Sequence, residues 1–236
     1  MLELLAPAGS MESVTAAVQN GANAVYLGGK AFNARRNASN FGDDELKKAV
    51  EYCHARNVKV YLTLNTLASD SELETAYDAI KSACESNVDA LILQDIGLAA
   101  IVRRVCSSVP LHASTQMSVQ SIEGIRVLEK LGFSRAVLPR ELSEKEIAAI
   151  SAQTDMELEY FVHGALCMCV SGQCLLSAFL GSRSGNRGLC AGPCRLPFKV
   201  KGGTGYGIYE DLPAEIDAIC AISELFEIGF EISFSF

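Results

Sequence analysis

Several patterns that would assign a protein to a common class are missing from this sequence. No apolar segment in the 236 residues approaches the roughly 20 residues that a membrane-spanning helix needs. The first residues, MLELLAPAG, lack the basic start and long apolar run of a signal peptide. No HExxH, GxSxG or paired-aspartate protease motif is present. We therefore expect a cytoplasmic protein without a membrane segment.

Acidic residues are absent from one long stretch of the chain. Between Tyr160 and Tyr209 there is no Asp or Glu, whereas the whole chain carries a net charge of −8. The same stretch contains Arg183, Arg187, Arg195, Lys199 and Lys201. An acidic body argues against a protein coated in nucleic acid, so this stretch is the one region predicted to contact an anion.

Cysteines are concentrated in the same part of the chain, which we call the Cys-rich block (residues 163–201). Five of the nine cysteines lie there: Cys167, Cys169, Cys174, Cys190 and Cys194. In a reducing compartment, such a group indicates metal-binding or catalytic thiols rather than disulfides. The other four, Cys53, Cys84, Cys106 and Cys220, lie on helical patterns and are predicted to be small core residues.

The remainder of the chain alternates short apolar runs with amphipathic segments. Strands are predicted near 2–6, 24–28, 59–64, 90–94, 111–114, 135–139 and 157–163, with a helix at 214–229 and an eighth strand at 230–236. Capping boxes at Ser71–Glu74 and Ser143–Glu146 are predicted to open two of the helices. Apolar strands without alternation favour a parallel sheet, and eight units favour a (β/α)₈ barrel over an open Rossmann sheet. We expect a single domain over residues 1–236, with the Cys-rich block inserted after strand seven.

Polar residues follow several of the predicted strands, where a barrel places its functional side chains. They are Asn65, Gln94, Asp95, His112, Ser114, Gln116, Arg140, Glu141 and His163. From this set we take His163, Arg140 and Gln116 as candidate catalytic residues. The alternative is that individual members cap the following helices, and that His163 hydrogen-bonds a neighbouring loop instead of carrying a proton.

Cationic and amide side chains near the same face are candidates for holding substrate. The set is Arg35, Asn40, His112, Arg183, Asn186, Arg187 and Arg195. Guanidinium groups suit a small dicarboxylate or an RNA phosphate. The alternative is a solvated loop whose charges serve solubility.

Two segments, ELEYFVHGALCMCVSGQCLLS and NRGLCAGPCR, resemble the signature of the U32 family of collagenase-like peptidases. ELLAPAG, ANAVYLGG, LHASTQ and LPREL are similar to strand ends of that family. The resemblance implies an RNA hydroxylase acting on a tRNA uridine or an rRNA cytidine with prephenate involved, or a hydroxylase of ubiquinone precursors. It also implies a [4Fe–4S] cluster on Cys167, Cys174, Cys190 and Cys194, and leaves Cys169 without an assigned role.

The residues themselves leave alternatives open. Four thiolates suit an iron–sulfur cluster or zinc, and their spacing matches neither a ferredoxin nor a zinc ribbon. A peptidase with Cys167 and His163 as nucleophile and base is a second interpretation. The resemblance weakens after Asp211, where relatives continue differently, so we also expect a C-terminally truncated chain and consider a non-catalytic paralogue. The sequence indicates no oligomeric state.

Overall fold

The computed structural model describes residues 2–34, 39–165 and 167–198, and three short strands at 206–207, 215–217 and 231–234. Arg35, Lys199, Lys201 and Cys220 lie outside the described residues, so the expectations placed on them are not tested.

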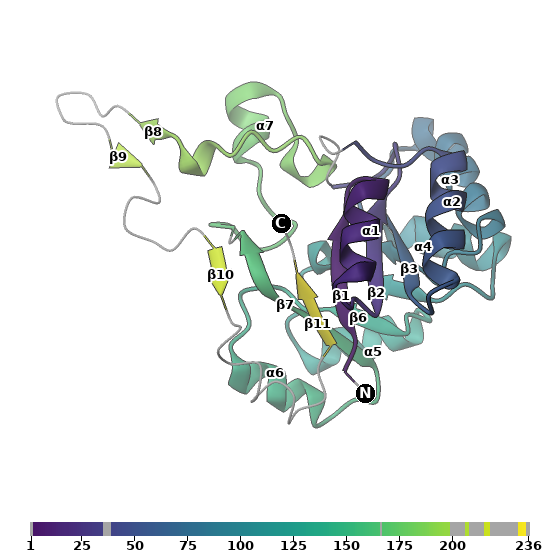
Figure 1. Cartoon of the computed structure of the whole chain (residues 1–236). Helices are drawn as coiled ribbons and strands as arrows, with labels where there is room; N and C mark the ends of the chain where they lie inside the picture. The colour runs from purple at the N-terminus through teal and green to yellow at the C-terminus, as the bar shows by residue number, and fades with distance from the viewer. Residues whose placement is uncertain are drawn as a thin grey trace.

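The centre of the molecule is a barrel of parallel strands (Figure 1). Seven strands fall where the apolar runs predict them: β1 (Leu4–Ala8), β2 (Ala24–Gly28), β3 (Lys59–Leu64), β4 (Ala90–Leu93), β5 (Leu111–Ala113), β6 (Arg135–Val137) and β7 (Glu157–Ala165). Each pairs in parallel with its neighbour in the chain. β11 (Glu231–Phe234) pairs in parallel with both β7 and β1 and completes a ring of eight. The predicted barrel and its eighth strand are confirmed.

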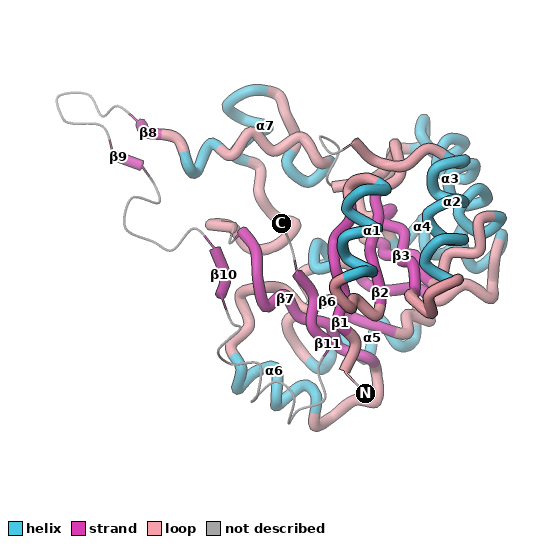
Figure 2. Tube along the Cα trace, viewed as in Figure 1, coloured by secondary structure: helices cyan, strands magenta, loops and turns pink. Residues whose placement is uncertain are grey.

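Six helices cover the outside of the barrel (Figure 2). They are α1 (Met11–Gln19), α2 (Asp43–His54), α3 (Leu73–Glu85), α4 (Ile96–Val105), α5 (Ile122–Lys130) and α6 (Glu144–Ser151). Side chains of Ser10, Asp95, Ser121 and Ser143 cap four of them by accepting a backbone N–H of the first turn. None of the described helices has the length and apolar character needed to cross a membrane.

Two hydrophobic clusters fill the molecule. The larger one packs one face of the strands against buried helix residues such as Val14, Leu46, Ile80 and Ile125. The smaller one, with Leu5, Tyr26, Tyr61 and Ile92 among its members, comes from the opposite strand faces and occupies the barrel interior. Because both faces are buried, the strands are apolar at successive positions, which explains the unalternating pattern.

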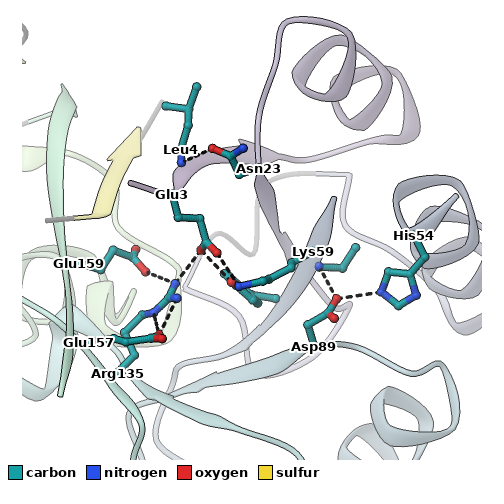
Figure 3. Close-up of polar contacts among 11 residues, drawn as sticks. Glu3, Leu4, Asn23, His54, Lys59, Asp89, Arg135, Glu157 and Glu159 are labelled. Atoms are coloured by element: carbon teal, nitrogen blue, oxygen red, sulfur yellow. Dashed lines mark hydrogen bonds and ion pairs between the residues drawn. The ribbon is translucent and has the colours of Figure 1, made fainter. Parts of the chain in front are cut away.

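A charged network closes the barrel at the end where the strands begin (Figure 3). The Arg135 side chain is 1% exposed and pairs with Glu3 at 2.9 Å and with Glu157 at 2.8 Å. Glu3 also accepts hydrogen bonds from Lys59 Nζ at 2.8 Å and from Tyr61 Oη at 2.7 Å. The starts of four strands are therefore joined by charge-assisted hydrogen bonds.

Two local predictions are wrong. Ser69, rather than Ser71, forms the capping box, with Glu72, and it opens a short 3₁₀ turn, η1 (Asp70–Glu72), ahead of α3. Residues Glu215–Asp217, inside the expected helix at 214–229, form a strand, β10, antiparallel to β7. β7 is the longest barrel strand of the described residues. β10 pairs with its last three residues, His163–Ala165.

Candidate functional site

A cavity of about 570 Å³ opens at the end of the barrel where the strands finish. Its lining combines side chains from loops that follow the strands with side chains of the Cys-rich block. The first group includes Asn33, Asn40, Asn65, Gln116 and Arg140, and the second includes Cys167, Cys169, Cys174, Cys190 and Cys194. The position is the one at which parallel barrels carry their chemistry.

The Cys-rich block is pressed closely against the loops of the barrel. Gly172 has φ +73°, and a Cβ there would lie 2.1 Å from the Gln116 carbonyl oxygen, in the turn η2 (Thr115–Met117) after β5. Gly188 has φ +76°, and its Cβ would lie 2.5 Å from the Asn33 carbonyl oxygen, in the loop after β2. Only glycine permits these two approaches, which together fix the block across the cavity.

Side chains add two further attachments. Glu141, after β6, accepts hydrogen bonds from the Ser171 backbone N–H at 2.5 Å and from Ser171 Oγ at 3.1 Å. Arg187, in the turn η3 (Gly185–Arg187), forms an ion pair with Glu72 of η1. The hydrogen bonds from Arg187 and Ser69 lower the pKa of Glu72 to about 2, so the pair persists in mildly acidic solution.

The five thiols of the block share the cavity and act on one another. Burial raises the pKa of the Cys167 thiol, Arg140 opposes that rise, and the Cys190, Cys194 and Cys174 sulfurs add to it. Burial also raises the pKa of Cys169, whose thiol shares a hydrogen bond with Cys174. No three His, Cys, Asp or Glu side chains of the described residues are gathered tightly enough for a single metal ion. The four predicted ligands are thus brought to one cavity, and Cys169, which had no assigned role, lies there with them.

Amide side chains form another part of the lining. Asn33 Nδ2 donates to Asn40 Oδ1 at 2.7 Å, and Thr63 Oγ1 donates to Asn33 Oδ1 at 3.2 Å. The Ala34 backbone N–H donates to Asn65 Oδ1 at 3.0 Å. Asn33 and Asn40 are both buried, so this neutral polar surface is held in place by its own hydrogen bonds.

Arg140 is the cationic side chain among the described residues that line the cavity. Its guanidinium carbon lies 4.0 Å from the centre of the Phe161 ring, and both residues line the cavity. Stacking on an aromatic face orients a guanidinium group without removing its charge. Arg140 is thus positioned to attract an anionic group that enters the cavity.

Two predicted histidines do not line the cavity. His112 is buried inside the barrel, with its ring 4.7 Å from that of Tyr61. Burial, followed by the charges of Arg135 and Lys59, holds the pKa of His112 well below its usual value, so it stays neutral and is poorly suited to binding an anion. His163 lies on the part of β7 that pairs with β10 and β11.

The remaining predicted residues line the cavity, lie exposed on the surface, or cap an element. Asn186 lines the cavity with the thiols. Arg183 and Arg195 are exposed, and Arg183 Nε donates to the Leu189 carbonyl at 3.2 Å. Asp95 and Ser114 cap α4 and η2, as the alternative interpretation of the strand-end residues proposed.

Sequence reasoning missed Asn33, Thr63 and Phe161, which line the same cavity. Thr63 and Phe161 lie inside apolar strands, where nothing distinguishes them from core residues. Asn33 lies in the AFNARRN segment, two residues before Arg35, and its amide side chain was the one signal that could have identified it.

The fold and site together define a class: a parallel (β/α)₈ barrel whose carboxyl-terminal mouth carries a thiol-lined cavity. The family model for peptidase family U32 matches residues 9–233. This chain belongs to peptidase family U32.

Two relatives and one solved structure are similar to this chain. It is 44% identical over 200 residues to a 23S rRNA 5-hydroxycytidine synthase of Escherichia coli, covering 85% of this chain and 30% of that protein. It is 34% identical over 239 residues to a tRNA hydroxylation protein of Bacillus subtilis, covering 97% of this chain and 57% of that protein. The chain therefore spans less than two thirds of either relative.

A solved structure of a U32 peptidase matches the fold with a TM-score of 0.68 at 16% identity, covering 99% of this chain and 92% of that one. At that identity the likeness concerns the fold alone.

Proposed function

We propose that this chain is the barrel of an RNA base hydroxylase that modifies a pyrimidine of rRNA or tRNA. The observation that carries the proposal is the cavity itself, in which cysteine thiols, a stacked guanidinium and fixed amides meet at one barrel mouth. Support comes from the names of the two relatives, each of which describes hydroxylation of an RNA.

We further propose that Cys167, Cys174, Cys190 and Cys194 hold a [4Fe–4S] cluster. Soft thiolate donors suit iron–sulfur centres, and all four thiols line the same cavity of about 570 Å³. When bound, such a cluster supplies one-electron redox chemistry at the cavity wall. Cys169 is the replacement ligand to test if one of the four is not used.

The other lining residues would bind and orient the substrates. Arg140 would hold a carboxylate of a small dicarboxylate co-substrate such as prephenate, by charge-assisted hydrogen bonds. The amides of Asn40, Asn65 and Gln116 carry both donors and acceptors, which match the edge of a pyrimidine base. The block, held across the cavity, would exclude water from the reacting carbon of a base bound beneath it.

Peptide hydrolysis is the second candidate, because both the family and the solved structure bear the name peptidase. A cysteine nucleophile needs a lowered pKa and an adjacent base. In this chain His163 is not among the described residues that line the cavity with Cys167. The site therefore favours the hydroxylase.

The test compares RNA from cells that lack the gene with RNA from cells that carry it. Mass spectrometry of RNA digests should show one pyrimidine nucleoside that has lost an oxygen atom in the deletion strain. The wild-type gene and Cys106→Ser, a cysteine outside the block, should restore the oxygen, whereas Cys190→Ser should not. Unchanged nucleosides, together with peptide cleavage by the purified protein, would establish the peptidase instead.

A further inference from the structure

One short helix, α7 (Leu176–Gly181), exposes large apolar side chains instead of burying them. Phe179 is 83% exposed and Leu180 is 60% exposed. Leu175, the residue that precedes α7, is 54% exposed. Figure 1 shows α7 beyond the barrel, on the side toward which β7 and β11 run. We call Leu175, Phe179 and Leu180 the Phe179 face.

The Phe179 face continues the wall of the cavity. Leu175 lines the cavity together with Met168 and Val170, which are also exposed. The Phe179 backbone N–H donates to the Leu175 carbonyl at 3.1 Å, so Phe179 lies one helical turn further along the same side. A polymer with one monomer inside the cavity would therefore place the neighbouring monomer against Phe179.

Charge around the Phe179 face indicates the chemistry of that molecule. The acid-free segment from Tyr160 to Tyr209 surrounds α7 in sequence, and Arg183 and Arg195 within it are exposed. The whole chain is acidic, at −8, so a polyanion would be repelled elsewhere and attracted here. An exposed aromatic ring within a cationic, acid-free segment is a combination that suits single-stranded nucleic acid, which binds by stacking and charge.

We propose that Phe179 is the stacking platform for the RNA nucleotide next to the one whose base enters the cavity. This inference rests on the proposed function, because it takes the substrate to be RNA. Arg183, exposed and four residues after Phe179, then contacts a flanking phosphate. Stacking of a base on an aromatic side chain is worth a factor of about 5 to about 150 in affinity.

The sequence offers a direct probe because it contains no tryptophan. Phe179→Trp would therefore place the only tryptophan of the chain on the Phe179 face. A single-stranded, pyrimidine-rich RNA of about ten nucleotides should quench its fluorescence, because a base stacks on the indole. Inorganic polyphosphate, which carries charge but no bases, should leave it unquenched. The matched control is Tyr77→Trp, at an aromatic residue of α3 that is 46% exposed.

Affinity for the same RNA provides the second measurement, by anisotropy of a labelled strand. Phe179→Ala should weaken binding by about 5- to 150-fold, Phe179→Tyr should retain it, and Tyr77→Ala should leave it unchanged. If wild-type protein binds the RNA and Phe179→Ala binds it equally well, this inference is wrong and the proposed function stands. If wild-type protein binds no RNA, both fail. If Phe179→Ala instead separates a dimer without changing RNA affinity, the Phe179 face is a contact between two copies of the chain and the proposal is refuted.

Discussion

At the scale of single residues, Arg135 and Glu3 show how a barrel interior accommodates charge. Both are buried, and each finds its opposite charge within 2.9 Å. The network lies at the amino-terminal end of the strands, opposite the cavity, where a parallel barrel builds stability rather than chemistry. Removing Glu3 would take from the buried Arg135 one of its compensating charges, which is costly.

Glu3 should make the stability of the protein depend on pH. Burial pushes the pKa of Glu3 up, but Arg135 and the hydrogen bonds from Lys59, Tyr61 and Arg135 lower it below its usual 4.5. Because the folded pKa is the lower one, the network stabilises the fold above about pH 4.5, and this stabilisation is lost as the pH falls through the folded pKa.

Glu3→Gln should therefore lower the free energy of unfolding by about 1–3 kcal/mol at neutral pH. The difference from wild type should be full at about pH 7 and smaller at about pH 3, below the usual pKa of 4.5, in urea unfolding followed by circular dichroism. Glu51→Gln, at an exposed position on α2, should change little at either pH. A Glu3→Gln effect that is equal at both pH values would mean that Glu3 does not titrate with the network.

At the scale of elements, the Cys-rich block behaves as one docked unit. It touches the loops after β2, β3, β5 and β6 through Gly188, Arg187, Gly172 and Ser171. The thiols on this block line the cavity because these contacts hold it across the barrel mouth.

Gly172→Ala should disturb that docking, because the new methyl group would meet the Gln116 backbone and φ is positive. We expect the protein to lose about 1–3 kcal/mol of stability and to hold less iron, if the proposed cluster binds there. Gly181→Ala, in the same block, is the matched control, since its Cβ would have no neighbour within 4 Å. Thermal unfolding and iron content measure the two effects. Equal values for both variants would show that the approach of Gly172 to Gln116 does not hold the block.

The sequence predicted most elements because their signals are local. Apolar runs marked seven strands, and the Ser143–Glu146 capping box marked the start of α6. Glu215–Asp217 was mistaken for part of a helix because its strand is created by pairing with the distant end of β7. The Ser69 cap was missed because the segment SDSELE contains two overlapping capping-box patterns. In both Ser69–Glu72 and Ser71–Glu74 a serine is followed three residues later by a glutamate.

At the scale of the whole molecule, the barrel brings together residues that the sequence could only place at strand ends. Asn40, Gln116, Arg140 and the cysteines meet in one cavity as that rule predicts. His112 does not, because its strand position turns it into the barrel interior against Tyr61. Phe161 could not be predicted, since its contribution depends on the stacking of Arg140 from another strand end.

The central claim is that the four thiols at the barrel mouth hold an iron–sulfur cluster, and the most direct test is iron and sulfide analysis of protein purified without oxygen. The account predicts a brown protein with about four iron and four sulfide atoms per chain. Cys190→Ser should lose that colour, while Cys106→Ser should keep it. Wild-type protein that binds one zinc ion and no sulfide, or Cys190→Ser protein with undiminished iron and sulfide, would contradict the account.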